Sequence, residues 1–352
     1  MTVNRKPLHL LHGQLVEVRS YHEIAQTLDA EGKLEGLPFM PEMARFCGVR
    51  IHVARRADKT CVAGGGIRKM NSTVFLQDLR CDGGYHDGCQ RGCLLFWKEA
   101  WLKPVEANAQ LSVVHLNHSA AADKWIAQLQ TRRNERYTCQ STELYQATDK
   151  ISRWSILPFM REMRNGELSF RGFIEIAYRT VRTRFFKLPE FGTLVGTQKK
   201  THQGDLNLRA GEVVDIKGPK EIQAALNSKG KNCGLALTPS MAIYLGGRHE
   251  VAFPVKKIIN EASGEMVNLS NTVALKGVTC SGPCVKNCPR SEYHYWRESW
   301  LQRADIESLD HAYVARAPRT TSVIRFQASA QADKGSFSTE HCAVPQVDAR
   351  TD

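Results

Sequence analysis

Two clusters of cysteines are the part of this sequence best suited to chemistry. Each lies in a glycine-rich segment after a predicted strand: Cys81, Cys89 and Cys93 in the first, Cys280, Cys284 and Cys288 in the second. Thiolates are soft ligands that select zinc, copper(I) or iron–sulfur clusters. Neither segment has the C-x2-C pair of zinc ribbons or the C-x2-C-x2-C run of bacterial ferredoxins. Three cysteines so close together, twice, still favour metal binding over buried, reduced thiols packed as small apolar residues.

A closed structural metal site needs four ligands, so each cluster lacks one. For the first cluster we prefer Cys139, in the segment RYTCQS, with His86 and Cys61 as competitors. For the second, the candidates are Cys233, His294 and a ligand that does not come from the protein. We expect zinc, because the clusters occupy structural positions, and keep an iron–sulfur cluster as the alternative.

The composition indicates the setting of these sites. The chain has 352 residues, and its 48 basic against 36 acidic residues give a net charge of +12. This charge favours an anionic macromolecule as partner, with RNA or DNA the first expectation and an acidic protein or a lipid headgroup as alternatives. The sequence shows neither a secretory signal nor an apolar run near the roughly 20 residues of a transmembrane helix, so we predict a cytoplasmic protein without a membrane span. Cytosolic thiols are kept reduced, so the eleven cysteines do not predict a disulfide framework.

The elements that must position the cysteines occur twice, because the chain contains two divergent copies of one module. At a constant offset of 198, the segment that begins at Gly13 matches the segment that begins at Gly211. After a one-residue shift, Cys81 matches Cys280, and the copies end on FWKEAWL and YWRESWL. Ordered matches of this kind indicate an internal repeat.

Beyond that first pair, the cysteines of the two copies do not match by our comparison. Cys93 precedes Trp97 by four residues, whereas Cys288 precedes Trp296 by eight. If both copies bind metal, we expect them to bind it differently, with the first copy the better site.

The residue pattern of each copy predicts a small, bent sheet. GQLVEVRS alternates as a half-buried strand does, EIAQTLDAEGK predicts a short helix ended by Gly32, and several short strands with turns follow. This order resembles SH3-like barrels, a likeness that carries no function. We predict an α+β protein with two β-rich, SH3-like modules and a helical connector. Its predicted parts are a first repeat at 1–106, a connector at 107–205, a second repeat at 206–305 and a partly disordered extension at 306–352.

The segment that ends each copy has an aromatic–acid–aromatic pattern. The tryptophans stand four residues apart, as on one face of a helix: Trp97 and Trp101, then Trp296 and Trp300. One interpretation is an aromatic platform for a base or another ligand. We favour the other, in which the tryptophans anchor a short helix on the sheet, because a buried tryptophan supplies so much apolar area.

The connector contains a basic amphipathic helix, predicted at 170–186. Its apolar residues recur at near-helical spacing: Phe173, Ile174, Ala177, Val181 and Phe185. The candidate anion-binding residues stand opposite: Arg171, Arg179, Arg182 and Arg184. We favour docking of the apolar face on a neighbouring domain, with contact to an anion, a membrane or a partner protein as alternatives.

Three functions agree with these features. The first is a metal-stabilised tandem-repeat binding protein that acts on an anionic macromolecule, and we lean to it because no catalytic motif is evident. The second is an iron–sulfur or zinc enzyme, or an accessory protein, in a redox or biosynthetic pathway. The third is an assembly scaffold that binds a protein partner through the 170–186 helix.

Overall fold

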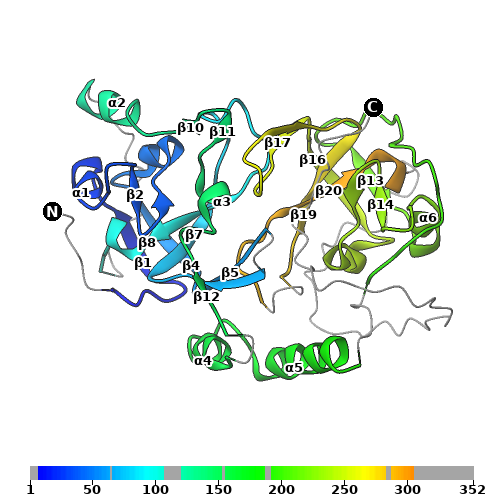
Figure 1. Cartoon of the computed structure of the whole chain (residues 1–352), viewed down its shortest axis with the longest axis horizontal. Helices are drawn as coiled ribbons and strands as arrows, with labels where there is room; N and C mark the ends of the chain where they lie inside the picture. Colours follow the sequence, from blue (N-terminus) through cyan, green and yellow to red (C-terminus); the bar gives the residue numbers. More distant parts are fainter. Residues whose placement is uncertain are drawn as a thin grey trace.

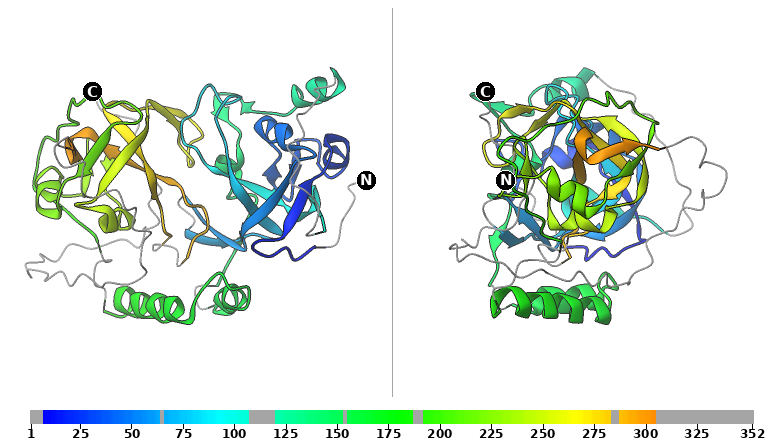
Figure 2. Two further views of the ribbon diagram at one scale, coloured as in Figure 1. Left: turned by 180° about the vertical axis from the view of Figure 1, so that it is seen from behind. Right: turned by 90° about the vertical axis from the view of Figure 1, so that its right-hand side faces the viewer.

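The protein consists of two β-rich modules that lie side by side (Figure 1). The computed structural model describes residues 7–63, 66–106, 120–152, 155–186, 192–282 and 287–304. The predicted extension at 306–352 and Cys284 lie outside the described residues. Figure 2 shows from behind and from the side that two helices of the connector run along one edge of the pair.

Each module is built on a curled antiparallel sheet of five strands. The order in the first sheet is β8 (Leu94–Lys98), β7 (Thr73–Arg80), β4 (Arg50–Arg56), β1 (Leu15–Val18) and β9 (Leu102–Pro104). The order in the second is β20 (Tyr293–Arg297), β19 (Thr272–Thr279), β16 (Arg248–Pro254), β13 (Val213–Ile216) and β21 (Leu301–Arg303). The same order thus recurs, and the prediction of an α+β protein with two β-rich modules is confirmed.

Matching irregularities bend both sheets. The register shifts between Val53 and Arg55 in β4 and between Val251 and Phe253 in β16, which are equivalent positions at the offset of 198. An extra residue in one strand increases its local twist and bends it, so the sheet can curl around its own apolar core.

Short elements complete each module. In the first they are α1 (Tyr21–Ala25), the hairpin β2 (Lys33–Leu34) and β3 (Leu37–Pro38), the 3-10 helix η1 (Pro41–Phe46), β5 (Lys59–Val62) and β6 (Gly66–Lys69). In the second they are α6 (Pro219–Ala224), β14 (Lys231–Asn232), β15 (Leu235–Ala236), η3 (Pro239–Tyr244), β17 (Lys257–Ile259) and β18 (Met266–Asn268). The predicted short helix after the first strand is confirmed, although it ends before Gly32.

The segment that ends each module is not the predicted α-helix. It runs from a strand into a single 3-10 turn, η2 (Glu99–Trp101) in the first module and η4 (Glu298–Trp300) in the second. The turn puts both rings of a pair into the core, and all four tryptophans are 0% exposed: Trp97, Trp101, Trp296 and Trp300. The aromatic platform is therefore wrong, because none of these rings presents a face to a ligand.

The acidic residue between the tryptophans has a structural role in both modules. The carboxylate of Glu99 accepts hydrogen bonds from the backbone N–H groups of Leu8, His9 and Leu10, at 2.8, 3.1 and 3.0 Å. The carboxylate of Glu298 likewise accepts from two backbone N–H groups of the segment before β13, both at 3.0 Å. Each acid thereby holds the chain that leads into the first strand of its sheet.

The connector divides between the first module and a helical edge. Its first part forms α2 (Ala120–Ile126), β10 (Arg132–Arg133), β11 (Arg136–Tyr137), α3 (Gln140–Glu143) and β12 (Asp149–Lys150). Strand β12 pairs with β6, so this part extends the first module. The helices α4 (Leu157–Arg164) and α5 (Phe170–Arg184) follow, and α5 lies where the basic helix is predicted. No described helix combines the length and the apolar character needed to cross a bilayer.

The apolar face of α5 is not docked as we favoured. Three of its predicted apolar residues, Ile174, Val181 and Phe185, are exposed, and so are Phe170 and Tyr178. The helix is amphipathic, but its apolar side faces outward, since periodicity sets which residues share a face and not what that face touches.

Candidate metal centre between the two modules

Four cysteines line one cavity of about 30 Å³ at the boundary between the modules. They are the four predicted ligands of the first cluster: Cys81, Cys89, Cys93 and Cys139. They come from the β7–β8 loop and from the residue before α3, so the fold brings together two segments that are distant in sequence. A space of this size holds about one or two water molecules.

The β7–β8 loop is folded so that its three cysteines converge. The backbone N–H of Cys81 donates to the carbonyl of Cys93 at 2.8 Å, which closes the base of the loop. Gly83 has φ +71°, and a Cβ there would lie 2.1 Å from the carbonyl oxygen of Cys89, so only glycine allows this close approach. The Sγ of Cys89 accepts a hydrogen bond from the backbone N–H of Ile259, in the second module, at 3.3 Å.

Cys139 reaches the cavity from the N-terminal end of α3. Its backbone N–H donates to Thr142 Oγ1 at 3.0 Å, and the next residue, Gln140, bonds to the backbone N–H and carbonyl of Phe96, both at 2.8 Å. These bonds fix the start of α3 against β8, and this fixes the position of Cys139 at the cavity.

Three of the cavity cysteines, Cys81, Cys93 and Cys139, have raised pKa values, so their thiols hold their protons in the metal-free protein. Burial raises the pKa of Cys81, with the Glu42 carboxylate acting in the same direction. Burial also raises the pKa of Cys139, and that of Cys93 to about 12, although Arg91 opposes the change at Cys93. A metal would have to displace these protons, which couples its binding to pH.

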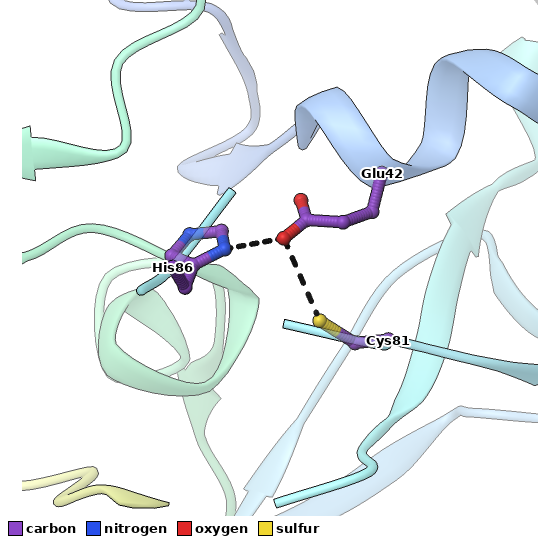
Figure 3. A group of neighbouring side chains, drawn as sticks. All are labelled: Glu42, Cys81 and His86. Carbon is purple, nitrogen blue, oxygen red and sulfur yellow. Dashed lines mark hydrogen bonds and ion pairs between the residues drawn. The ribbon is translucent and has the colours of Figure 1, made fainter. Parts of the chain in front are cut away.

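Beside the cavity, Cys81 belongs to a second group with Glu42 and His86 (Figure 3). The Glu42 Oε1 atom lies 3.8 Å from Cys81 Sγ and 2.5 Å from His86 Nδ1. Within the described residues this is the one trio of potential ligand atoms that lie within 4.8 Å of one another. No motif in the sequence selects Glu42. One sign was there, because the equivalent residue of the second copy is Ser240, so the acid occurs in one copy only.

Two states of this trio are chemically consistent. Without metal, His86 and Glu42 form a buried ion pair: burial alone would lower the pKa of His86, but Glu42 raises it. With metal, His86 Nδ1 would be a ligand, and its Nε2–H would stay on the carbonyl of Thr138, 3.1 Å away, as in many metal sites. The Glu42 Oε2 atom is buried and makes no hydrogen bond within the described residues, so it is free to serve a ligand.

Charged residues from both modules close the cavity. Arg91, from the first loop, and Arg290, from the second, both pair with Glu261 and Glu292, at N–O distances between 2.5 and 3.1 Å. All four side chains are buried or nearly so. Burial by itself would raise the pKa of Glu292, but Arg290 and Arg91 lower it, so the acid is ionised.

The two loops are related by an approximate twofold symmetry, which corrects our matching of the cysteines. Cys288 is equivalent to Cys89, since 288 − 89 = 199 and 280 − 81 = 199. Gly282 has φ +73° and would place a Cβ 2.4 Å from the Cys288 nitrogen, much as Gly83 does at Cys89. The residue equivalent to Cys93 is Glu292, which we missed because we paired the third cysteine of each run by order.

The predicted second metal cluster is not assembled in the same way. The Cys280 thiol lies 3.8 Å from Ser240 Oγ, and the Cys288 Sγ lies 3.6 Å from the Sγ of Cys61, in the first module. The candidate fourth ligands Cys233 and His294 have other neighbours, Thr201 and Tyr244. No trio of potential ligands within 4.8 Å includes these residues in the described parts of the chain.

Helix α5, which carries the predicted anion-binding arginines, runs along the edge of the pair of modules (Figure 1). None of these arginines is among the described residues that line the cavity. Arg171 is exposed, and Arg179 pairs with Glu175 at 2.6 Å. Arg182 is half-buried, and the side chain of Arg184 lies outside the described part of the structure.

Comparisons with protein-family models, with curated proteins and with solved structures return no match for this chain. Its function is therefore argued from the site alone.

Proposed function

We propose that this protein is an iron–sulfur protein whose cluster is held by Cys81, Cys89, Cys93 and Cys139. The observation that carries the proposal is that these four cysteines line one cavity. Four cysteine thiolates are the usual ligand set of such clusters. Bound there, the cluster would supply electron transfer, which fits a redox or accessory role in a biosynthetic pathway.

The spread of the four sulfurs favours a cluster over a single zinc ion. In a tetrahedral zinc site with Zn–S bonds of 2.3 Å, the sulfurs lie about 3.8 Å apart. Among the described residues no three of these sulfurs lie within 4.8 Å of one another. Ligands that bind different irons of one cluster stand further apart than this. A cluster is larger than the space of about 30 Å³ between the thiols, so its binding would have to widen the cavity.

The surroundings also suit a cluster. The cavity is closed by residues of both modules, among them Ile259, Arg290 and Glu292. Burial and nearby charge both tune the potential of a cluster. The charges of Arg91 and Arg290 act to lower the pKa of Cys93, and they would offset part of the negative charge of a thiolate-bound cluster.

The test is metal and sulfide analysis of the full-length protein purified without oxygen. We expect iron and acid-labile sulfide in equal amounts, with broad visible absorption. Cys89→Ser and Cys139→Ser should each lose most of the iron and the colour. Cys233→Ser is the matched control, because this half-buried thiol contacts Thr201 in the second module, and it should keep both.

A mononuclear zinc site is the outcome that would overturn the proposal. A colourless protein with one zinc per chain, lost in Glu42→Gln and His86→Ala but kept in Cys89→Ser and Cys139→Ser, would place the metal in the trio of Figure 3. Cys81 belongs to both groups, so its substitution does not separate them.

A second candidate function is binding of an anionic surface by α5. A row of apolar residues on this helix is between 44% and 71% exposed: Phe170, Ile174, Tyr178, Val181 and Phe185. Arg171 and Arg182 follow members of the row by one residue and flank it. An exposed apolar row beside arginines suits an anionic lipid surface better than RNA, because phosphate contacts alone need no apolar row.

Vesicle co-sedimentation tests this second function. We expect binding to vesicles with anionic lipid and not to neutral ones, weakened by Ile174→Ser and by Arg171→Glu. The control is Ile243→Ser, which removes an exposed isoleucine side chain from the second module. If RNA is bound instead, with a steep salt dependence that Ile174→Ser leaves unchanged, the membrane interpretation fails and our original expectation of a nucleic acid stands.

A further inference from the structure

A pair of cysteines joins the two modules next to the four-cysteine cavity, across Arg290, which lines that cavity and contacts Cys61. Cys61, in β5 of the first module, and Cys288, in the β19–β20 loop of the second, have their Sγ atoms 3.6 Å apart. They are 227 residues apart in sequence, and both are buried. Neither lines the cavity between Cys81 and Cys139, so this contact is separate from the proposed cluster.

The contact lies in an environment that differs from ordinary core packing of thiols. Arg290 donates to the Cys61 carbonyl at 3.0 Å, and its Nη1 lies 3.7 Å from the Cys61 sulfur. The interaction with Cys61 lowers the pKa of Cys288 to about 7, while the same contact raises that of Cys61. Of the two sulfurs, Cys288 therefore loses its proton more readily and is the stronger nucleophile near neutral pH.

The approximate symmetry shows that this pairing is specific to one side. The residue equivalent to Cys61 is Ile259, since 259 − 61 = 198, and it contacts Cys89 as Cys61 contacts Cys288. Arg91 donates to the Ile259 carbonyl at 3.2 Å, as Arg290 does to that of Cys61. The modules therefore meet at two equivalent contacts. One joins two cysteines, Cys61 and Cys288, and the other joins Ile259 to a single cysteine, Cys89.

We propose that Cys61 and Cys288 are a redox-active dithiol, which a small peroxide converts to a disulfide that links the two modules. The Cys288 thiolate attacks one peroxide oxygen, the O–O bond breaks, and a sulfenic acid and hydroxide form. The Cys61 sulfur then attacks the Cys288 sulfur, the S–O bond breaks, and water leaves with the Cys61 proton. In sum, two thiols lose two electrons and two protons, and hydrogen peroxide becomes two waters.

Burial selects the oxidant and gives the link a consequence. Sulfurs this deeply buried admit a peroxide more readily than a bulky disulfide such as oxidised glutathione. The loop that carries Cys288 also carries Arg290 and Glu292 into the cavity wall. The disulfide would therefore fix the second module over the first, and reduction would release it.

Tryptic mapping of the full-length protein tests the proposal. Cleavage isolates Cys61 in the peptide TCVAGGGIR and Cys288 in NCPR, and neither contains another cysteine. After hydrogen peroxide we expect these two peptides linked, with a loss of two hydrogen masses that a reductant reverses. Oxidised protein should also melt several degrees higher than reduced protein.

Two variants keep the test decisive. In Cys61→Ser the link should vanish, and Cys288 should instead accumulate sulfenic acid, trapped by a 1,3-diketone reagent. Cys139→Ser should still form the link, so failure of the iron–sulfur proposal would leave this one intact. If peroxide links Cys288 to a cavity cysteine, or leaves Cys61 and Cys288 as free thiols, the proposal is overturned.

Discussion

The two modules share a framework and differ in one loop, which joins β7 to β8 in the first module and β19 to β20 in the second. The groups that can do chemistry lie in this loop. Both loops begin with a cysteine, turn at a glycine of positive φ and carry a buried arginine at equivalent positions, Arg91 and Arg290. The first loop then has Cys93 where the second has Glu292, and Glu42 below it where the second module has Ser240. The frame is therefore kept by backbone geometry, while a few substitutions decide whether a loop can hold a metal.

The second loop has gained a different role. Its Arg290 and Glu292 cross to the first module and complete the cavity there. The first loop makes the reciprocal crossing, since Gln90 and Arg91 bond to the backbone of β17. One module thus presents the thiols and the other supplies part of their enclosure, which makes the boundary of two similar folds an asymmetric site.

The largest expected difference between the modules is in metal content. Cys81→Ser removes a thiol of the cavity, whereas Cys280→Ser changes its equivalent beside Ser240. We expect the first variant to lose essentially all bound metal and the second to keep it, as measured by metal analysis of the purified proteins. Equal losses would mean that both loops bind metal, so the metal site would not distinguish the two modules.

The next largest expected difference is in the stability that each buried acid between the tryptophans, Glu99 or Glu298, contributes to its module. Glu99 accepts three backbone hydrogen bonds and pairs with Arg56 at 2.7 Å, whereas Glu298 accepts two. Glu99→Ala leaves a buried arginine that has lost this partner, so it should lower the free energy of unfolding by about 3–5 kcal/mol. Glu298→Ala should cost about 1–3 kcal/mol, the price of buried donors left without an acceptor.

Urea denaturation of both variants measures this difference. The Arg56→Met, Glu99→Met double variant is the control: it should recover part of the loss, because no buried charge then lacks its partner. Equal losses in Glu99→Ala and Glu298→Ala would show that the ion pair with Arg56 adds nothing to the hydrogen bonds.

The framework of both modules was predictable because it rests on local patterns. Alternation identified β1, and apolar periodicity identified α5. The prediction of a helix for FWKEAWL was wrong. Two tryptophans four residues apart also enter the same core when one lies in a strand and the other in the 3-10 turn that follows it. The likeness to SH3-like barrels stays a prediction.

The site was predictable only within the first module. Soft-ligand chemistry and spacing selected Cys81, Cys89, Cys93 and Cys139, which do line one cavity. Contacts between the modules join residues far apart in sequence: Arg91 and Ile259 are separated by 168 residues, and Cys61 and Cys288 by 227. No periodicity spans such separations, so the enclosing charges and the Cys61–Cys288 pair could not be inferred from one sequence.

A smaller difference concerns the hydrogen bond of one tryptophan in each core. Trp101 Nε1 donates to Thr27 Oγ1 at 3.1 Å, whereas Trp300 Nε1 is buried without a partner in the described structure, and Ala225 stands where Thr27 would be. Thr27→Ala should cost about 1–3 kcal/mol, because it leaves a buried donor unsatisfied. Ala225→Thr should stabilise by about 0.5–1.5 kcal/mol.

Thermal and urea unfolding of the Thr27→Ala and Ala225→Thr variants measure these changes in the free energy of unfolding. Thr27→Ser keeps the hydroxyl and should restore most of the loss, which separates the hydrogen bond from packing of the methyl group. A destabilising Ala225→Thr would indicate that the second core has no room for the missing hydroxyl.

The smallest expected difference is at the first helix of each module, and it depends on pH. The Glu23 carboxylate accepts from the backbone N–H and the hydroxyl of Ser20 and pairs with Arg19 at 2.8 Å, whereas Glu221 accepts only from the backbone N–H of Gly218 among the bonds described. Burial acts to raise the pKa of Glu23, but the Ser20 and Arg19 contacts lower it from 4.5 to about 2. At neutral pH, Glu23→Gln should cost about 0.5–1 kcal/mol and Glu221→Gln a few tenths.

The sign of the pH effect follows from linkage. A carboxyl whose pKa is lowered on folding stabilises the native state above its unfolded pKa, and this stabilisation fades as the pH falls through its folded pKa. The gap between wild type and Glu23→Gln should therefore be full above pH 4.5 and close as the pH approaches about 2. Urea midpoints at pH 7 and near pH 3 measure it, with Glu221→Gln as the matched control. A gap that persists unchanged at the lower pH would mean that the amide disturbs helix packing and that the charge of Glu23 is not what distinguishes the two helices.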